Sequence, residues 1–474
     1  MSSKPTRRST LKALAGAVAA PSLLSRCQAP PAPFEAPSND TALPPDGPAI
    51  STTVILMMEN RTFDHYMGAL SLVEGRDDVD GLRLEHVVPD ADGEPVHPFH
   101  LDESCLRDPP HGWNSSHAQF NEGANDGFVR VHAGGRGEVA SQAMGYLTRE
   151  DLPVFYALAD DNALCDRWFA SVMGGTWPNR MYSLCGTSRG MRGNDFSRVP
   201  LEGPSIFDQL DQAGVSWKIY AFDAAWALLL DGLGGVDALG EHILPISRYY
   251  EDADAGRLPE VVFVEPGYLV NDDHPPHHPM LGQAFVGTIY DALAHGPHAD
   301  GFLMVINYDE HGGFFDHVPP PKVPDEHAED GFDQLGFRVP ALVVGPYAKP
   351  GIVHTQFDHT SVLAHLQHRY GLPPLSERNA AAQDLHSCLD ADRIATRTPR
   401  PPTSIPLITL TRDDVDDICF YAHVQGQPEL AHCYDVGLAP AAGDFRPLAE
   451  AHLRLVLARA EARGILRITP SAGA

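Results

Sequence analysis

The chain has 474 residues, of which 43% are hydrophobic and 20% are charged, and its formal net charge is -29. This composition is typical of a globular protein that buries a large core. The excess of acidic residues argues against nucleic-acid binding, which requires a basic surface, and against simple electrostatic docking to anionic lipid. We therefore expect no nucleic acid among its partners.

The N-terminus is typical of an export signal. Residues 6–12 contain the pair Arg7-Arg8 and precede an alanine-rich apolar stretch, 13–24. This pattern fits a twin-arginine signal, although Thr10 replaces the usual aromatic residue. The apolar stretch is too short for a membrane span, so we expect no transmembrane segment in the mature protein.

Residues 1–28 are assigned to this signal region and 29–48, rich in Pro, Ala and Asp, to an extended linker. Cys27 ends a sequence similar to a lipoprotein box, but Arg26 stands where a small residue is expected, which argues against lipid anchoring there. The expected location is periplasmic or secreted, reached through the twin-arginine export machinery.

Short β-rich runs alternate with helical stretches through the catalytic region. Such alternation predicts an α/β fold, a three-layer sandwich with a mainly parallel central sheet and helices on both faces. The segment between about 74 and 150 is rich in Gly, Asp and His and predicts a loop-rich cap over the site. The expected strands are 54–58, 215–221, 261–264, 302–306 and 339–344.

A second Pro-rich break at 396–406 divides the chain into a predicted catalytic domain, 49–393, and a C-terminal extension, 394–474. Apolar residues recur at helical spacing between 444 and 464 and predict a terminal helix that packs on the catalytic domain. The seven cysteines are too widely spaced for a compact zinc knuckle, while disulfides suit an exported protein. Their pairing cannot be read from the sequence.

Two acidic pairs follow β-rich runs directly. Glu59-Asn60 comes after the run 54–58, and Asp309-Glu310 comes after 302–306. Ligands of open α/β sheets bind beyond the carboxyl ends of the strands, so both pairs are expected in one crevice. Acidic residues at strand ends are more often solvated loop residues, but two pairs in this context favour a site.

Thr176 is the predicted nucleophile of this crevice. A threonine hydroxyl is a poor nucleophile at neutral pH, and a cation is one of the few ways to activate it when no histidine base is adjacent in sequence. Three carboxylates and one amide oxygen offer hard ligands, which favour Mg²⁺, Ca²⁺ or Mn²⁺ over a thiolate-type zinc site. The predicted metal ligands are Glu59, Asn60, Asp309, Glu310 and Thr176. The stretch around Thr176 is otherwise an ordinary turn in which Pro178 opens a helix.

Asn179 lies three residues after Thr176, so a helix over 179–184 would bring its amide near the nucleophile, where it can donate to a phosphate oxygen. We therefore predict that Asn179 binds substrate.

Histidines occur in two places that border the predicted crevice. His111 and His117 lie in one loop, where histidines are more often hydrogen-bonded surface residues than catalytic ones. His274, His277 and His278 lie among prolines, which indicates either a metal-binding tract or a rigid loop.

Three further residues are interpreted as structural. Asp316 and His317 are expected to support the site or to pack beside it. Asp358 is interpreted as the N-cap of a helix over 361–370, which should end at Gly371, rather than as a ligand.

Five motifs in this order resemble the bacterial phosphoesterase family of non-specific phospholipases C and metal-dependent acid phosphatases, within the alkaline phosphatase superfamily. They span roughly residues 50 to 375 and together make a specific match. The motifs are Glu59–His65, Thr176–Arg180, Asn271–Pro276, Asp309–Val318 and Asp358–Ser361.

The resemblance implies an alkaline-phosphatase-like fold, a divalent metal ion as cofactor (Ca²⁺, Mg²⁺, Mn²⁺ or Zn²⁺) and a covalent intermediate on Thr176. It assigns the metal to Glu59-Asn60 and to Asp309-Glu310. It also implies that His111 and His274 contact the phosphate or protonate the leaving group, and we predict that His278 binds substrate.

Three functions compete at this stage. The first is a phosphodiesterase of phospholipase C type that acts on a phospholipid or a small-molecule phosphoester, which a threonine nucleophile favours within the family. The second is an acid phosphatase that acts on phosphomonoesters. The third is a catalytically silent phosphate-binding protein, which the presence of every expected ligand argues against. A sulfatase is excluded, because threonine cannot be converted to formylglycine.

Overall fold

The computed structural model describes residues 49–102, 105–133, 137–233, 239–419 and 446–471. The predicted twin-arginine signal, the linker and Cys27 lie outside these ranges. Within the described part of the chain, no helix is both long enough and apolar enough to cross a bilayer.

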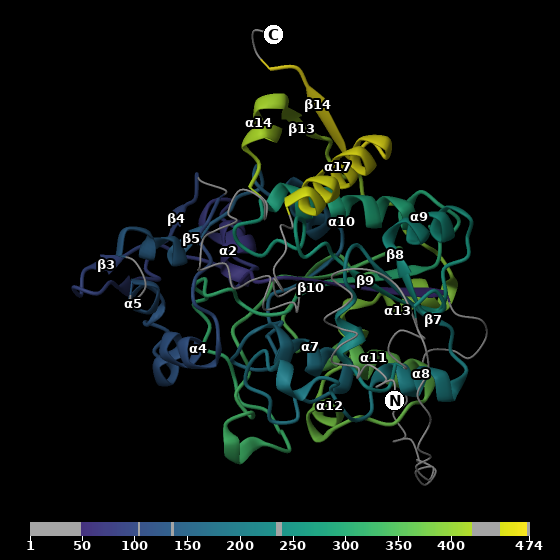
Figure 1. Cartoon of the computed structure of the whole chain (residues 1–474), viewed down its shortest axis with the longest axis horizontal. Coiled ribbons are helices and arrows are strands. Elements are labelled where there is room, and N and C mark those ends of the chain that lie inside the picture. Colours follow the sequence, from purple (N-terminus) through teal and green to yellow (C-terminus); the bar gives the residue numbers. More distant parts are fainter. Residues whose placement is uncertain (1–48, 103–104, 134–136, 234–238, 420–445, 472–474) are drawn as a thin grey trace, which may run out of the picture.

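An eight-stranded sheet forms the centre of the molecule, in the order β12-β6-β11-β10-β1-β9-β7-β8 (Figure 1). β11 runs antiparallel to both of its neighbours, and every other pair in the sheet is parallel. The prediction of a mainly parallel sheet is therefore confirmed. The strands are β1 (Thr52–Met58), β6 (Ala163–Cys165), β7 (Trp217–Ala221), β8 (Ile243–Pro245), β9 (Val261–Glu265), β10 (Phe302–Tyr308), β11 (Ala341–Val344) and β12 (Gly351–Val353).

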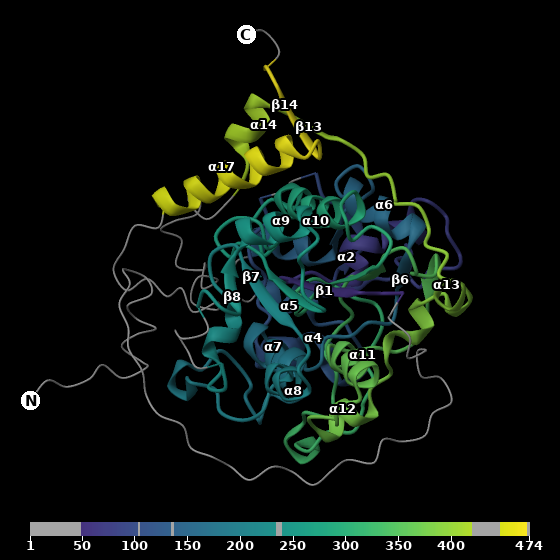
Figure 2. The same cartoon turned by 90° about the vertical axis from the view of Figure 1, so that its right-hand side faces the viewer.

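Helices cover both faces of this sheet, as Figures 1 and 2 show. β1 and β10 are buried along their whole length, which explains their continuous apolar runs. One face carries α6 (Pro153–Asp161), α9 (Ile246–Asp254) and α10 (Pro279–Ala294); the other carries α7 (Thr176–Cys185), α8 (Ile206–Ala213) and α11 (Thr360–Tyr370). Short helices are α2 (Phe63–Met67), α3 (Ala69–Leu72), α12 (Glu377–Ala381) and α13 (Ala391–Thr396).

The predicted loop-rich cap has a small apolar core of its own. Phe128 of this cap packs with Phe315 and Phe337, which come from the catalytic region after β10. The cap is thereby fastened to the segment that follows Glu310. Its elements are β2 (Val88–Pro89), β3 (Pro95–Val96), β4 (Phe99–His100), α4 (Trp113–Phe120), α5 (Phe128–Ala133) and β5 (Gly145–Tyr146).

The C-terminal part contains β13 (Ile408–Thr411), α14 (Arg412–Asp417), α17 (Arg446–Ala462) and β14 (Leu466–Thr469). α17 lies along α10 in both views (Figures 1 and 2). Just after α17, Arg463 pairs with Asp291 of α10 at 3.0 Å and with Asp254 of α9 at 2.7 Å. The domain boundary at 393/394 stays a prediction.

A disulfide joins Cys105 of the cap to Cys419 of the C-terminal part. Among the described cysteines, Cys165, Cys185 and Cys388 are free and buried.

Candidate active site

The two acidic pairs lie side by side at the carboxyl ends of adjacent strands. β1 and β10 pair in parallel with Met58 opposite Tyr308, so the residues that follow leave the sheet together. The Asn60 N–H donates to Asp309 Oδ1 at 2.9 Å, and the Asn60 side-chain amide donates to Glu310 Oε1. Pairs about 250 positions apart in the sequence thus form one buried group.

This convergence depends on a tight approach of two turns. Asn60 adopts a left-handed backbone conformation with φ 59°, which is uncommon for a residue other than glycine and clusters at functional sites. Gly312 faces it with φ 61°, and a Cβ atom at Gly312 would lie 2.2 Å from the Asn60 carbonyl oxygen. The Gly312 N–H donates to Glu310 Oε2 at 2.8 Å, which orients that carboxylate.

Thr176 reaches this group from the first position of α7. Its Oγ1 donates to Glu59 Oε2 at 3.2 Å. Arg180 Nε, one turn later on the same face of the helix, donates to the other Glu59 oxygen at 3.0 Å. Arg180 also binds Glu265 at 3.0 Å. One carboxylate therefore positions the predicted nucleophile and is itself held by a buried guanidinium. The helix predicted over 179–184 begins three residues earlier, at Thr176. Its N-cap is Gly175, so Pro178 lies inside the first turn rather than at the start of the helix.

The charges in this group repel one another. Burial, followed by the negative charge of Asp309, raises the pKa of Glu59 well above its usual value, although Arg180 acts in the opposite direction. Burial also raises the pKa of Glu310, and the Asp309 charge adds to that rise. Concentrated buried carboxylates of this kind need a positive partner.

Two buried oxygens fit a cation. Among the described residues, Asn60 Oδ1 and Asp309 Oδ2 are shielded from solvent and accept no hydrogen bond. Buried polar atoms are nearly always satisfied, so unsatisfied acceptors beside two further carboxylates suit a hard metal ion. The types of donor therefore suit the divalent cation predicted from the sequence, but Glu59, Asp309 and Glu310 do not form a group whose ligand atoms all lie within 4.8 Å of one another.

One of the predicted histidines lies beside the same group, and a second packs against that histidine. His111 Nε2 is 3.2 Å from Asn60 Nδ2 and 3.6 Å from Glu310 Oε1, and the rings of His111 and His274 meet edge to face at 5.5 Å. The structure thus places His111 beside the carboxylate group and His274 against His111. His117 instead bonds the Trp113 carbonyl within α4.

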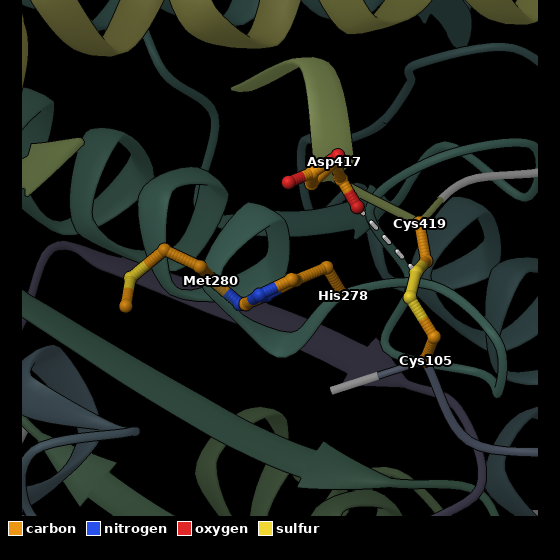
Figure 3. Close-up of a disulfide and its surroundings, with 5 residues drawn as sticks. All are labelled: Cys105, His278, Met280, Asp417 and Cys419. Carbon is orange, nitrogen blue, oxygen red and sulfur yellow. Dashed lines mark hydrogen bonds between the residues drawn. A yellow bond between two sulfur atoms is a disulfide. The ribbon is translucent and has the colours of Figure 1, made fainter. Parts of the chain in front are cut away.

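Asn179 and His278 make other contacts. The Asn179 side chain donates to the carbonyls of Val172, Gly174 and Gly175, and so shapes the loop before the nucleophile. His278 is the N-cap of α10, where its ring accepts from the Met280 N–H at 3.0 Å (Figure 3). Burial lowers the pKa of His278 to about 4. The substrate-binding roles of both residues stay predictions.

Sequence reasoning gave no role to Arg180 or Asp108. Arg180 stands four residues after Thr176, a spacing that indicates a shared helix face. Asp108 lies 3.3 Å from His111 Nδ1 and precedes it by three positions, but nothing in the loop sequence marks it.

Among the described residues, three groups bring ligand-type atoms within 4.8 Å of one another and could hold a metal ion. In one of them Arg338 already pairs with Asp316 at 2.8 Å and with Asp64 at 3.0 Å, so a guanidinium supplies the positive charge. This agrees with a supporting role for Asp316. The groups are Asp108, His111 and His274; His368, Asp384 and His386; and Asp64, Asp316 and His317.

The predicted cap at Asp358 is displaced by one residue. α11 begins at Thr360, so His359 occupies the N-cap position, while Asp358 Oδ1 accepts from the Thr360 N–H at 2.9 Å. The carboxylate still satisfies a free N–H of the first turn, which is the physical role of a cap. The helix ends at Gly371 with φ 67°, as predicted.

The chain matches the Phosphoesterase family over residues 50–373. It is 34% identical over 387 residues to phospholipase C B of Mycobacterium tuberculosis, covering 68% of this chain and 74% of that protein. It is 32% identical over 412 residues to non-specific phospholipase C3 of Arabidopsis thaliana, covering 77% of each. A solved structure of a protein in the alkaline phosphatase superfamily from Vibrio parahaemolyticus is similar with a TM-score of 0.38 and 12% identity, covering 73% of this chain and 74% of that one.

Proposed function

The chain belongs to the Phosphoesterase family and is a hydrolase of phosphoric ester bonds, and from this premise we propose that it is an exported, metal-dependent enzyme of phospholipase C type. In this proposal it cleaves phosphodiesters through a covalent intermediate on Thr176. The observation that carries the proposal is the position of Thr176 Oγ1, 3.2 Å from Glu59 Oε2 beside the two convergent acidic pairs. The phospholipase C names of its relatives support the diester class. The Arg7-Arg8 signal supports export.

The cofactor we propose is a divalent ion, Ca²⁺, Mg²⁺, Mn²⁺ or Zn²⁺. Bound there, it would supply the positive charge that makes the Thr176 hydroxyl more acidic and offsets negative charge on the phosphoryl oxygens. The oxygens left without hydrogen bonds at Asn60 and Asp309 support this assignment. The residues that would hold it are Glu59, Asn60, Asp309, Glu310 and Thr176.

The chain itself positions the attacking oxygen. Glu59 accepts the Thr176 hydrogen bond, and Arg180 prevents that carboxylate from turning away. Thr176 also opens α7, so the partial positive charge of the helix N-terminus lies beside the oxygen that becomes negative. A fixed nucleophile of this kind lowers the entropy cost of attack.

In the proposed reaction the Thr176 oxygen bonds to phosphorus while the bond from phosphorus to the alcohol oxygen breaks. The hydroxyl proton passes to solvent, and a protonated imidazole of His111 or His274 gives its proton to the departing alcohol. Water then attacks the phosphothreonine, returns a proton to that imidazole and releases Thr176, which regains its proton. The position of His111 beside Glu310 and Asn60, with the His274 ring against His111, supports this role.

Substrate charge distinguishes a diesterase from an acid phosphatase. A phosphomonoester brings a second negative charge to a buried site that already contains Glu59, Asp309 and Glu310, whereas a diester brings one. We therefore expect a higher kcat/KM for p-nitrophenyl phosphorylcholine than for p-nitrophenyl phosphate, assayed with purified enzyme across pH. A higher value for the monoester at every pH would assign the chain to the acid phosphatases instead.

A further inference from the structure

Cys419 anchors both of the segments that carry the predicted catalytic histidines. Its sulfur is bonded to Cys105, which stands six residues before His111, across a sequence separation of 314. Its carbonyl oxygen accepts from the backbone N–H of His278 at 2.9 Å, four residues after His274. Figure 3 shows the Cys105–Cys419 disulfide next to His278.

Apart from the disulfide, the segment 105–111 is held by side-chain contacts. No backbone-to-backbone hydrogen bond among the described residues involves it. Gln119 Nε2 donates to the Pro110 carbonyl at 2.8 Å, and Gly313 packs closely enough that a Cβ atom there would lie 2.6 Å from Pro109 Cβ. These contacts hold the end of the segment near His111, while at its beginning Leu106 is buried in the main hydrophobic core and the disulfide adds a covalent restraint at Cys105.

We propose that the Cys105–Cys419 disulfide is a positioning element for His111, and that turnover depends on its oxidation. The bond holds segment 105–111 so that His111 Nε2 stays beside Asn60 and Glu310. This proposal rests on the proposed function, in which His111 serves the leaving group. It also gives a role to the part of the chain beyond the family match, which ends at residue 373 and so excludes Cys419.

The bond can be opened selectively. Cys105 is exposed and Cys419 is 4% exposed, and the other described cysteines, Cys165, Cys185 and Cys388, are free thiols that dithiothreitol leaves unchanged. Dithiothreitol supplies two electrons and two protons: the S–S bond breaks, two S–H groups form, and the reagent closes to its cyclic disulfide.

The first experiment compares three forms: the oxidised wild-type enzyme, the same enzyme after dithiothreitol, and the double variant Cys105→Ser/Cys419→Ser. At a temperature where circular dichroism shows every form folded, we expect kcat/KM on p-nitrophenyl phosphorylcholine to fall about 10- to 100-fold when the bond is absent, as for a displaced catalytic group. Dithiothreitol should have no further effect on the double variant, which controls for reduction elsewhere. Undiminished kcat/KM in the folded, bond-free forms overturns the proposal.

A mutant cycle separates positioning from general stabilisation. In a His111→Gln background, removal of the disulfide should change kcat/KM less than about twofold, because there is no imidazole left to position. An equal loss in both backgrounds overturns the positioning role.

A second readout does not depend on activity. His111 is 8% exposed, so diethyl pyrocarbonate should modify it slowly in the oxidised protein. Without the disulfide, the segment 105–111 can open locally, and we expect the modification of His111 to be about tenfold faster. Peptide mass spectrometry measures the rate, with the more exposed His100 as internal reference. An unchanged His111 rate refutes the positioning role, whereas a faster rate in a protein without phosphodiesterase activity refutes the proposed function alone.

Discussion

Thr176 and Arg180 lie one helical turn apart and both bind Glu59, so a single carboxylate sets the position of the predicted nucleophile. The Thr176 side chain is buried and its one described hydrogen bond is the contact with Glu59. Its removal thus deletes the attacking oxygen with little change in packing.

We predict that Thr176→Ala lowers kcat by at least about a thousandfold, as loss of an activated nucleophile does, while the urea midpoint changes little. Ser183→Ala is the matched control, because Ser183 is a hydroxyl residue on the same helix that bonds only the Arg180 carbonyl among the described residues. Retention of more than about a tenth of wild-type kcat in Thr176→Ala excludes it as the nucleophile.

Asp309 shows a conflict between stability and function. Its charge raises the pKa of Glu59, so in the absence of a cation the charged pair costs folding free energy at neutral pH. Asparagine keeps the oxygen that accepts from the Asn60 N–H but removes the charge.

We predict that Asp309→Asn abolishes cation-dependent turnover, yet in excess EDTA is as stable as the wild type or more stable by on the order of 1 kcal/mol. Urea unfolding in EDTA measures the stability, and titration of the chelated enzyme with Mg²⁺, Ca²⁺, Mn²⁺ and Zn²⁺ measures the turnover. Wild-type activity that survives complete chelation contradicts metal dependence.

At the scale of elements, the site depends on how two strand ends turn. The runs at 54–58 and 302–306 were predictable as strands, because β-branched and apolar residues fill them and both faces of the sheet are covered. The register of β1 with β10 was not, because a short apolar run pairs equally well at several offsets.

We predict that Gly312→Ala destabilises the protein by roughly 1–3 kcal/mol and lowers kcat at least about tenfold, because its Cβ would displace the Asn60 backbone and separate the acidic pairs. Gly190→Ala is the matched control: Gly190 has φ 70° but no atom within 4 Å of an added Cβ, so it tests backbone strain alone. Thermal unfolding and steady-state kinetics measure both effects. Equal losses of kcat in the two variants would remove the assigned role of Gly312.

At the scale of the whole molecule, a buried ionic network joins the cap to the sheet domain. His317 lies 2.7 Å from Asp64 and 3.0 Å from Asp80 of the cap, and Arg338 donates to the Asp80 carbonyl at 2.7 Å. Burial by itself lowers the pKa of His317, but Asp64 and the hydrogen bonds to both carboxylates outweigh it and raise that pKa to about 9.

The pKa of His317 is higher in the folded protein than in the unfolded chain, where it is about 6.5. Protonated His317 therefore contributes its full stabilisation of the fold below about pH 6.5, and this contribution is lost as the pH rises through about 9. We predict that wild type exceeds His317→Gln in unfolding free energy by on the order of 3 kcal/mol near pH 6, and by much less near pH 10. Urea titrations of both proteins at each pH measure this. A difference that does not change with pH contradicts the raised pKa.

Local sequence determined the strands, the acidic pairs that end them and Thr176 as the nucleophile to propose, because strand propensity, burial pattern and ligand chemistry are properties of a few neighbouring residues. The same reasoning misjudged the start of α7 and the cap of α11, where neighbouring turns decide which residue ends the helix.

Only the tertiary structure decided which distant groups meet. It brought His111 to Glu310 and His274 to His111, directed His278 to the cap of α10, and joined Cys105 to Cys419. Such pairings depend on the way in which the long loops fold back over the sheet. The entropic cost of closing a loop rises only slowly with its length, so the spacing of two residues along the chain does not select which of them meet.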